Sequence, residues 1–160
     1  ELTKMWLNLW SGLDENTVTY TPVGSFVSGY DDAYWCSSQY SVNSDNAVVR
    51  LFNRGVDAEG QSSKTNPYYY VRGCRSFTGT LGQYNLRDIG PLGGLIFYIN
   101  GTTFYEAAPY DQAALYIWSN IIASVSTSEA IGTGAANTTA IISQVGHTTS
   151  AAKLCDNIYL

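Results

Sequence analysis

Apolar and aromatic residues in the first half of the chain gather in short runs separated by polar stretches. The runs AYWCSS, NAVVRLFN and YYYVRGCRSF are rich in β-branched and aromatic residues and are bounded by turn-forming ones. This pattern predicts strands at about 34–38, 47–53 and 68–77.

Residues 1–12 carry apolar side chains at helical spacing and end in a glycine. The spaced residues are Leu2, Met5, Trp6 and Leu9. Because glycine commonly ends a helix, we predict one helix that stops at Gly12.

The second half predicts a hairpin followed by helical structure. Gly94 to Ile99 and Thr103 to Ala107 read as strands, and Asn100-Gly101 between them is a strong hairpin signal. A strand-like piece is expected around Tyr116 to Trp118. Strands and helices do not alternate regularly, so the pattern favours an α+β fold over a parallel α/β sheet.

Two helical segments are expected near the C-terminus. A helix capped by Asn137 or Thr138 should run to about residue 145 and place Ile141, Ile142 and Val145 on one face. The stretch SAAKLCDNIYL either continues this helix or forms a second one after a break at residues 147–149.

The stretch from residue 53 to residue 70 has almost no core-forming side chains and is built from Asn, Ser, Asp, Gly, Gln and Tyr. This mixture of adaptable polar groups and rigid amphipathic rings is typical of recognition surfaces. The candidate anchors are Tyr40, Arg54, Tyr68, Tyr69 and Tyr70. The alternative is an ordinary hairpin loop whose tyrosines pack on the domain itself, and because strand residues alternate faces, Tyr68 and Tyr70 would share one side.

Composition excludes several classes of protein. The 160 residues fit one domain with a real core. Only 13% of the residues are charged and the net charge is −5, which argues against a nucleic-acid partner because phosphate binding needs clustered Lys and Arg. The longest apolar run, GGLIFYI, is too short to cross a membrane.

Candidate chemistry is sparse. Cys36 and Cys74 lie on predicted strands and could face each other, but spacing alone does not establish a disulfide, and Cys155 leaves an odd count. The single His147 has no nearby ligand partners, and a hydroxyl–base pair with Thr148 or Thr149 would lack an orienting acid. The acidic pairs at 14–15 and 31–32 read as solvated loop residues rather than a calcium site. We therefore expect no enzyme activity, no metal and no cofactor.

Several motifs together resemble one family. In the first half these are ELTKMW, AYWCSSQY, NAVVRLF and YYYVRGCRSF. In the second half they are DIGPLGGLIFYING, EAAPYDQ, IGTGAANTTAI and AAKLCDN. The set resembles the Lcl C-terminal domain family of collagen-like adhesins and phage fibres, with its two halves in reversed order.

The reversed order divides the chain into residues 1–78, which look like the family's second half, a joint at 79–85, and residues 86–160, which look like its first half. A circular permutant, a window cut from a tandem array, or a fragment completed by neighbouring chains would each explain this order. A single domain formed by both halves is the expectation.

The resemblance implies a fold similar to C-type lectins and formylglycine-generating enzymes, with a twisted antiparallel sheet, two helices and long loops. It implies an extracellular, cell-surface or virion location, and a binding face varied by a diversity-generating retroelement. The partner would be a cell-surface glycan or protein, and the rival function is a structural repeat of a fibre or filament whose half-domains pair between neighbours. The expected ligand-binding residues are Asp31, Asp32, Gln39, Tyr40, Asn43, Asp45, Arg50, Asn53, Arg54, Asp57, Tyr68 and Tyr70.

Overall fold

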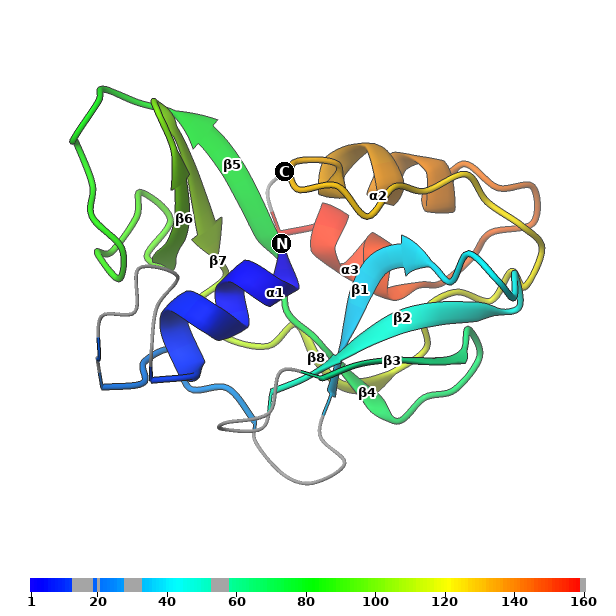
Figure 1. Cartoon of the computed structure of the whole chain (residues 1–160). Helices are drawn as coiled ribbons and strands as arrows, with labels where there is room; N and C mark the ends of the chain where they lie inside the picture. Colours follow the sequence, from blue (N-terminus) through cyan, green and yellow to red (C-terminus); the bar gives the residue numbers. More distant parts are fainter. Residues whose placement is uncertain (13–18, 20, 28–32, 53–57, 159–160) are drawn as a thin grey trace.

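The computed structural model describes residues 1–12, 19, 21–27, 33–52 and 58–158. Its larger sheet has five strands in the order β3-β2-β1-β4-β8 (Figure 1). These strands are β1 (Ala33–Gln39), β2 (Asn46–Leu51), β3 (Ala58–Ser63), β4 (Tyr69–Val71) and β8 (Ala113–Tyr116). Strands β1 and β4 run parallel, and the other pairings of this sheet are antiparallel.

A second, three-stranded antiparallel sheet has the order β5-β7-β6. Its strands are β5 (Cys74–Thr78), β6 (Leu95–Asn100) and β7 (Thr103–Ala107). Strands β6 and β7 form the predicted hairpin, with Asn100 paired to Thr103. Gly101 fills the first loop position with φ of 61°, a backbone region that glycine enters without strain.

Helices cover the sheets at two places (Figure 1). At the N-terminus, α1 (Leu2–Met5) continues directly into the π-helical turn η1 (Trp6–Trp10) and ends before Gly12, whose φ is 90°. Helices α2 (Gly134–Ile142) and α3 (Ala151–Asp156) pack against the five-stranded sheet. The α+β class predicted from the sequence is confirmed at this level.

Each sheet contains strands from both halves of the chain. Strand β4 pairs with β8, and β5 pairs with β7, so residues before position 79 and residues after position 85 build both sheets. Glu1 adds another link, since its carboxylate accepts hydrogen bonds from the N–H groups of Gly132 (2.9 Å) and Gly134 (3.2 Å). The carboxylate thereby binds N–H groups at the start of α2 that have no partner within the helix.

Two apolar clusters stabilise this arrangement. One joins α1 and η1 to the three-stranded sheet and to the aromatic residues Phe26, Tyr34 and Phe52. The other fills the space between the five-stranded sheet and α2 and α3, and contains Trp35 and Trp118. Burial of such large side chains is the main source of free energy for folding.

The structure corrects four expectations about the elements. The N-cap of α2 is Thr133, and the predicted caps Asn137 and Thr138 lie inside the helix. The predicted strand 68–77 is two strands, β4 and β5, which belong to different sheets. The polar stretch after residue 53 contains β3, which pairs with β2 along its whole length. Val145 is 98% exposed rather than on a buried face, because α2 ends at Ile142 and the chain turns away there.

Candidate functional site

The predicted ligand-binding residues fall into two groups. Asp31, Asp32, Asn53, Arg54 and Asp57 lie outside the described residues, as do the acidic residues at 14–15. The structure places the other seven but does not bring them to one surface. Those seven are Gln39, Tyr40, Asn43, Asp45, Arg50, Tyr68 and Tyr70.

The five-stranded sheet has two ends of different character. The Tyr68 end is defined by the strand termini Ala33, Leu51, Ala58 and Tyr69, which the register places together. The Lys64 end is the opposite end, defined by the strand termini Gln39, Asn46 and Ser63. Four steps of β2 lie between the pairs Ala33–Leu51 and Gln39–Ala47, so at about 3.3 Å per residue the two ends are roughly 13 Å apart.

Tyr40, Asn43 and Asp45 lie in the β1–β2 connection at the Lys64 end, whereas Tyr68 directly precedes β4 at the Tyr68 end. Asn43 holds the turn itself, since its Oδ1 accepts a hydrogen bond from the Asp45 N–H at 3.0 Å. Tyr40 and Tyr68 therefore lie at different ends of the sheet.

Lys64 is fully buried at the Lys64 end. Its Nζ donates to Gln39 Oε1 (2.8 Å) and to the backbone carbonyls of Ala123 (2.9 Å) and Ile122 (3.3 Å), and it lies 5.0 Å from the centre of the Trp118 ring. Burial lowers the pKa of this ammonium because the charged form loses hydration. Three oxygen acceptors compensate for that loss.

Gln39 belongs to the same network. Its Oε1 also accepts from the Val125 N–H at 2.8 Å, and its own N–H donates to Thr127 Oγ1 at 2.8 Å. The side chain predicted to bind a ligand instead holds residues 122–127 against the sheet. The serine-rich, apolar-poor sequence around Lys64 gave no indication that this lysine would be buried.

Two other predicted residues also have structural contacts. Arg50 is 5% exposed, with its guanidinium 5.9 Å from the Trp6 ring centre and 3.7 Å from a carboxylate oxygen of Glu59. Tyr70 is half-buried, with its ring 5.6 Å from that of Tyr34. Tyr68 and Tyr70 thus do not form a pair of exposed rings, because Tyr68 is 69% exposed and Tyr70 belongs to the core.

An aromatic layer lies beneath the Tyr68 end. Tyr34, the second residue of β1, has its ring 4.7 Å from Phe52, and Phe26 lies 4.8 Å from Phe52. The Tyr34 hydroxyl donates to Asp111 Oδ2 and accepts from the Val27 N–H, both at 3.0 Å. Burial raises the pKa of this hydroxyl well above its usual range.

Arg72 packs against this aromatic layer. Its guanidinium lies 4.5 Å from the Phe26 ring centre and pairs with Asp111 Oδ1 at 2.6 Å. It also donates to the carbonyls of Gly24 (3.0 Å), Ser25 (3.2 Å) and Ala108 (3.1 Å). These contacts fix segment 24–27 onto the sheet, and sequence reasoning did not assign either Arg72 or Asp111.

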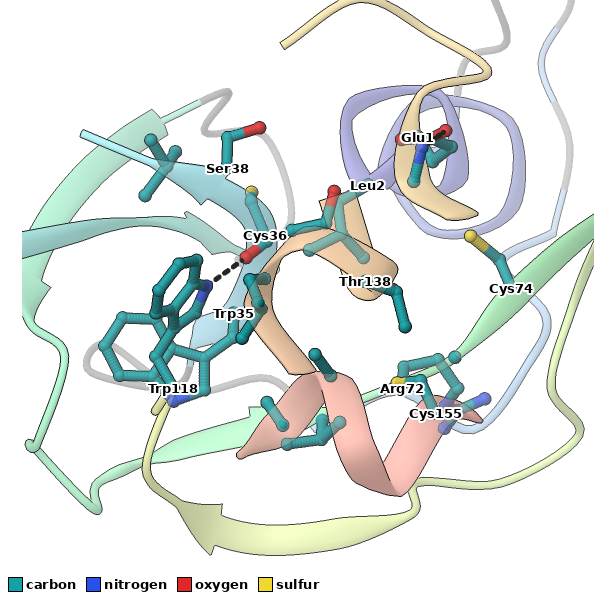
Figure 2. A pocket seen from close by; sticks show the side chains of 18 of the residues that line it. Glu1, Leu2, Trp35, Cys36, Ser38, Arg72, Cys74, Trp118, Thr138 and Cys155 are labelled. Carbon is teal, nitrogen blue, oxygen red and sulfur yellow. Dashed lines mark hydrogen bonds between the residues drawn. The ribbon is translucent and has the colours of Figure 1, made fainter. Parts of the chain in front are cut away.

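The three cysteines line one cavity of about 130 Å³ between the sheets and helices (Figure 2). A neighbouring cavity of about 340 Å³ shares five of its lining residues, Glu1, Cys74, Gly134, Thr138 and Cys155. All three thiols are free, so the Cys36–Cys74 disulfide considered above is not formed. Burial raises each thiol pKa to about 12, which keeps the sulfur protonated and a poor nucleophile.

His147 makes a hydroxyl pair, but not with a neighbouring threonine. Its Nε2 lies 2.9 Å from Oγ of the buried Ser150, which already accepts a hydrogen bond from the Lys153 N–H as the cap of α3. A buried capping hydroxyl is not accessible to a substrate, so this pair is structural.

Within the described part of the chain, no group of three or more His, Cys, Asp or Glu residues is placed to hold a metal ion. None of the described helices is long and apolar enough to span a bilayer. No family model, curated protein or solved structure matches the chain.

Proposed function

We propose that this chain is an extracellular or virion-surface recognition module that binds a cell-surface glycan or protein at the Tyr68 end of the five-stranded sheet. The observation that carries the proposal is the convergence of four strand termini at that end, above a buried aromatic layer. The predicted binding residues at 31–32, 53–57 and 68 are joined in sequence to those termini. The class of function rests on the family resemblance.

The physical argument is preorganisation. Binding costs less entropy when the supporting backbone is already ordered. At the Tyr68 end, Tyr34, Phe52 and the Arg72–Asp111 pair hold the first residues of β1 and segment 24–27. Tyr68 directly precedes β4 and is mostly exposed, and such a ring can stack on a sugar face or a peptide.

The test is binding of the purified chain to a glycan array and to whole bacterial cells. Tyr68→Ala removes the exposed ring at the proposed surface, and Tyr40→Ala is the matched control at the Lys64 end. We expect selective binding that falls at least about tenfold in Tyr68→Ala and stays unchanged in Tyr40→Ala, because loss of an aromatic anchor removes more than about 1.4 kcal/mol.

The rival function, a structural repeat of a fibre, makes a different prediction in the same samples. A repeat that pairs half-domains between neighbours should assemble into long, open polymers and should tolerate Tyr68→Ala. Polymers without selective binding would therefore overturn the recognition proposal. Equal loss of binding in Tyr40→Ala and Tyr68→Ala would move the site away from the Tyr68 end.

A further inference from the structure

Strand β3 forms one lateral edge of the five-stranded sheet, with no described strand beyond it (Figure 1). It pairs with β2 through six consecutive residues without a register shift. The other lateral edge, β8, carries a shift against β4, and its Leu115 has φ of 61°. Bulges and kinks of this kind prevent a further strand from adding, and β3 has neither.

The two edges of the three-stranded sheet are also poor acceptors for a strand. Strand β6 has a register shift between Ile96 and Tyr98. Residues of β5 line the same cavity as Ala135 and Thr139 of α2, so the helix stands beside that strand. Among the described strands, β3 is therefore the edge best suited to pairing.

Two backbone hydrogen bonds show which residues of β3 direct their N–H and C=O groups toward β2 and which direct them outward. The Lys64 N–H donates to the Asp45 carbonyl, and the Tyr40 N–H donates to the Asn46 carbonyl. Directions alternate along a strand, so Ala58, Gly60 and Ser62 direct their backbone groups toward β2. Glu59, Gln61 and Ser63 direct theirs outward, and their side chains are exposed. The Ser63 carbonyl already accepts from the Asn66 N–H, which leaves it one further lone pair.

We propose that β3 is a dimerisation edge, which pairs antiparallel with β3 of a second copy of this chain about a two-fold axis at Gln61. In this register Gln61 faces Gln61 of the partner subunit, and Glu59 faces a serine hydroxyl of the partner rather than another carboxylate. Glu59 is the sole charged residue of the strand, so no like charges lie directly opposite each other.

A side-chain amide ladder favours a second copy over an unrelated peptide. The Asn46 amide nitrogen donates to Gln61 Oε1 on the same face of the sheet. In the proposed dimer the Gln61 amide nitrogen continues the ladder across the two-fold axis, where the second copy presents an identical pair of amides. Such ladders of Asn and Gln add to the stability of paired strands, and a peptide of arbitrary sequence would not extend this one.

The dimer would be weak and closed. A single polar strand pair buries much less surface than a stable interface requires, so association should be detectable only at high protein concentration. Because the contact is isologous, it ends at two copies and does not propagate into a fibre. Antiparallel pairing also places the two Tyr68 ends at opposite ends of the joined sheet, so this inference does not depend on the proposed binding surface.

The test is sedimentation equilibrium over a wide range of concentrations. We expect a reversible monomer–dimer equilibrium that strengthens as salt screens the net charge of −5 on each copy. Gln61→Pro removes an outward N–H while leaving the bonds to β2 intact, and it should raise the dimer dissociation constant at least about tenfold without changing the melting temperature. Gln61→Ala, which keeps the N–H and loses only the amide ladder, should weaken the dimer less.

A second variant pair tests the register. Gln61→Cys should form a disulfide-linked dimer under mild oxidation, because residue 61 faces its own copy at about 5.5 Å between Cα atoms. Glu59→Cys faces Ser63 of the partner and should cross-link far less. A chain that stays monomeric at all concentrations would overturn the proposal, as would a Gln61→Pro variant that dimerises like the parent or cross-linking that is equal in the two cysteine variants.

Discussion

Both ends of the five-stranded sheet are rich in polar residues, but these residues are buried and hydrogen-bonded at one end and partly exposed at the other. At the Lys64 end, a lysine, a glutamine and several backbone carbonyls satisfy one another in a buried network. At the Tyr68 end, polar groups such as Asp111 and the Tyr34 hydroxyl lie at the margin of an aromatic layer, and Tyr68 is exposed. A polar sequence therefore does not by itself mark a binding surface. What decides is whether the surrounding chain supplies hydrogen-bond partners for the polar side chains.

The largest effect should come from removing the Arg72 guanidinium beneath the Tyr68 end. Arg72→Met leaves Asp111 without its ion pair and three backbone carbonyls without this donor. Loss of one partner of a buried ion pair costs about 3–5 kcal/mol. Urea denaturation should show this decrease in the free energy of unfolding, and Arg72→Lys should recover only part of it, since lysine lacks the forked geometry. A decrease below about 1 kcal/mol would mean that segment 24–27 is held by other contacts.

Lys64→Met tests the opposite end of the sheet. It should lower the free energy of unfolding by about 2–3 kcal/mol, because the carbonyls of Ile122 and Ala123 lose a buried donor. Hydrogen exchange should accelerate in residues 122–127 while the Tyr68 end keeps its protection. Lys153→Met is the matched control, since the Lys153–Asp156 pair is exposed and should contribute almost nothing. Equal effects of the two lysine substitutions would contradict the buried network.

Tyr34→Phe should lower the free energy of unfolding by a smaller amount, about 1–2 kcal/mol. The ring keeps its packing against Phe52, and only the hydrogen bonds to Val27 and Asp111 are lost. The measurement is the denaturation midpoint at neutral pH. A change as large as that of Arg72→Met would show that the hydroxyl, rather than the ion pair, positions Asp111.

The two ends should also respond oppositely to alkaline pH. The pKa of Tyr34 is raised in the folded state, so its contribution to stability is present below about pH 10 and is lost as the pH rises further. The pKa of Lys64 is lowered by burial, so its contribution improves as the pH rises toward the usual lysine value. Stability measured between pH 8 and pH 11, about the range of these titrations, should fall less steeply in Tyr34→Phe and more steeply in Lys64→Met than in the parent chain. If stability fell with pH at the same rate in the parent chain and both variants, the proposed contributions of Tyr34 and Lys64 would be wrong.

The smallest expected change in stability is that of Tyr68→Ala and Tyr40→Ala. Neither tyrosine belongs to the apolar clusters, so each substitution should shift the free energy of unfolding by less than about 0.5 kcal/mol. Thermal melting monitored by circular dichroism is sufficient to check this. A loss of stability in Tyr68→Ala alone would assign Tyr68 a packing role and remove the basis for using it as a binding probe.

Local patterns predicted the local elements well. The helix at residues 2–10 and the hairpin at Asn100-Gly101 were correct, because each depends on side chains close together in sequence. Strand β3 was missed because its sequence, AEGQSS, has no apolar alternation and is ordered by its pairing with β2. The predicted strand 68–77 contains Arg72 and Gly73, where the chain passes from one sheet to the other.

The supporting residues of the candidate site could not be found in this way. Lys64, Arg72 and Asp111 act through partners between 25 and 77 positions away in the chain. One signal was present but unused, the isolated Glu106 in the apolar strand TFYEA. Its buried carboxylate pairs with Arg75 and accepts from the N–H groups of Leu92 and Gly94, so it shapes the glycine-rich turn at residues 90–94.

The pairing of β4 with β8 and of β5 with β7 has a consequence for biosynthesis. Neither sheet can be completed until residues 103–116 have left the ribosome, because each contains a strand whose neighbour is made late. The β1–β2–β3 meander can form early, but its aromatic face stays uncovered during that interval. Contacts of long sequence separation also slow folding. Nascent chains stalled before residue 100 should therefore be bound by chaperones, and release should follow synthesis of β7 and β8.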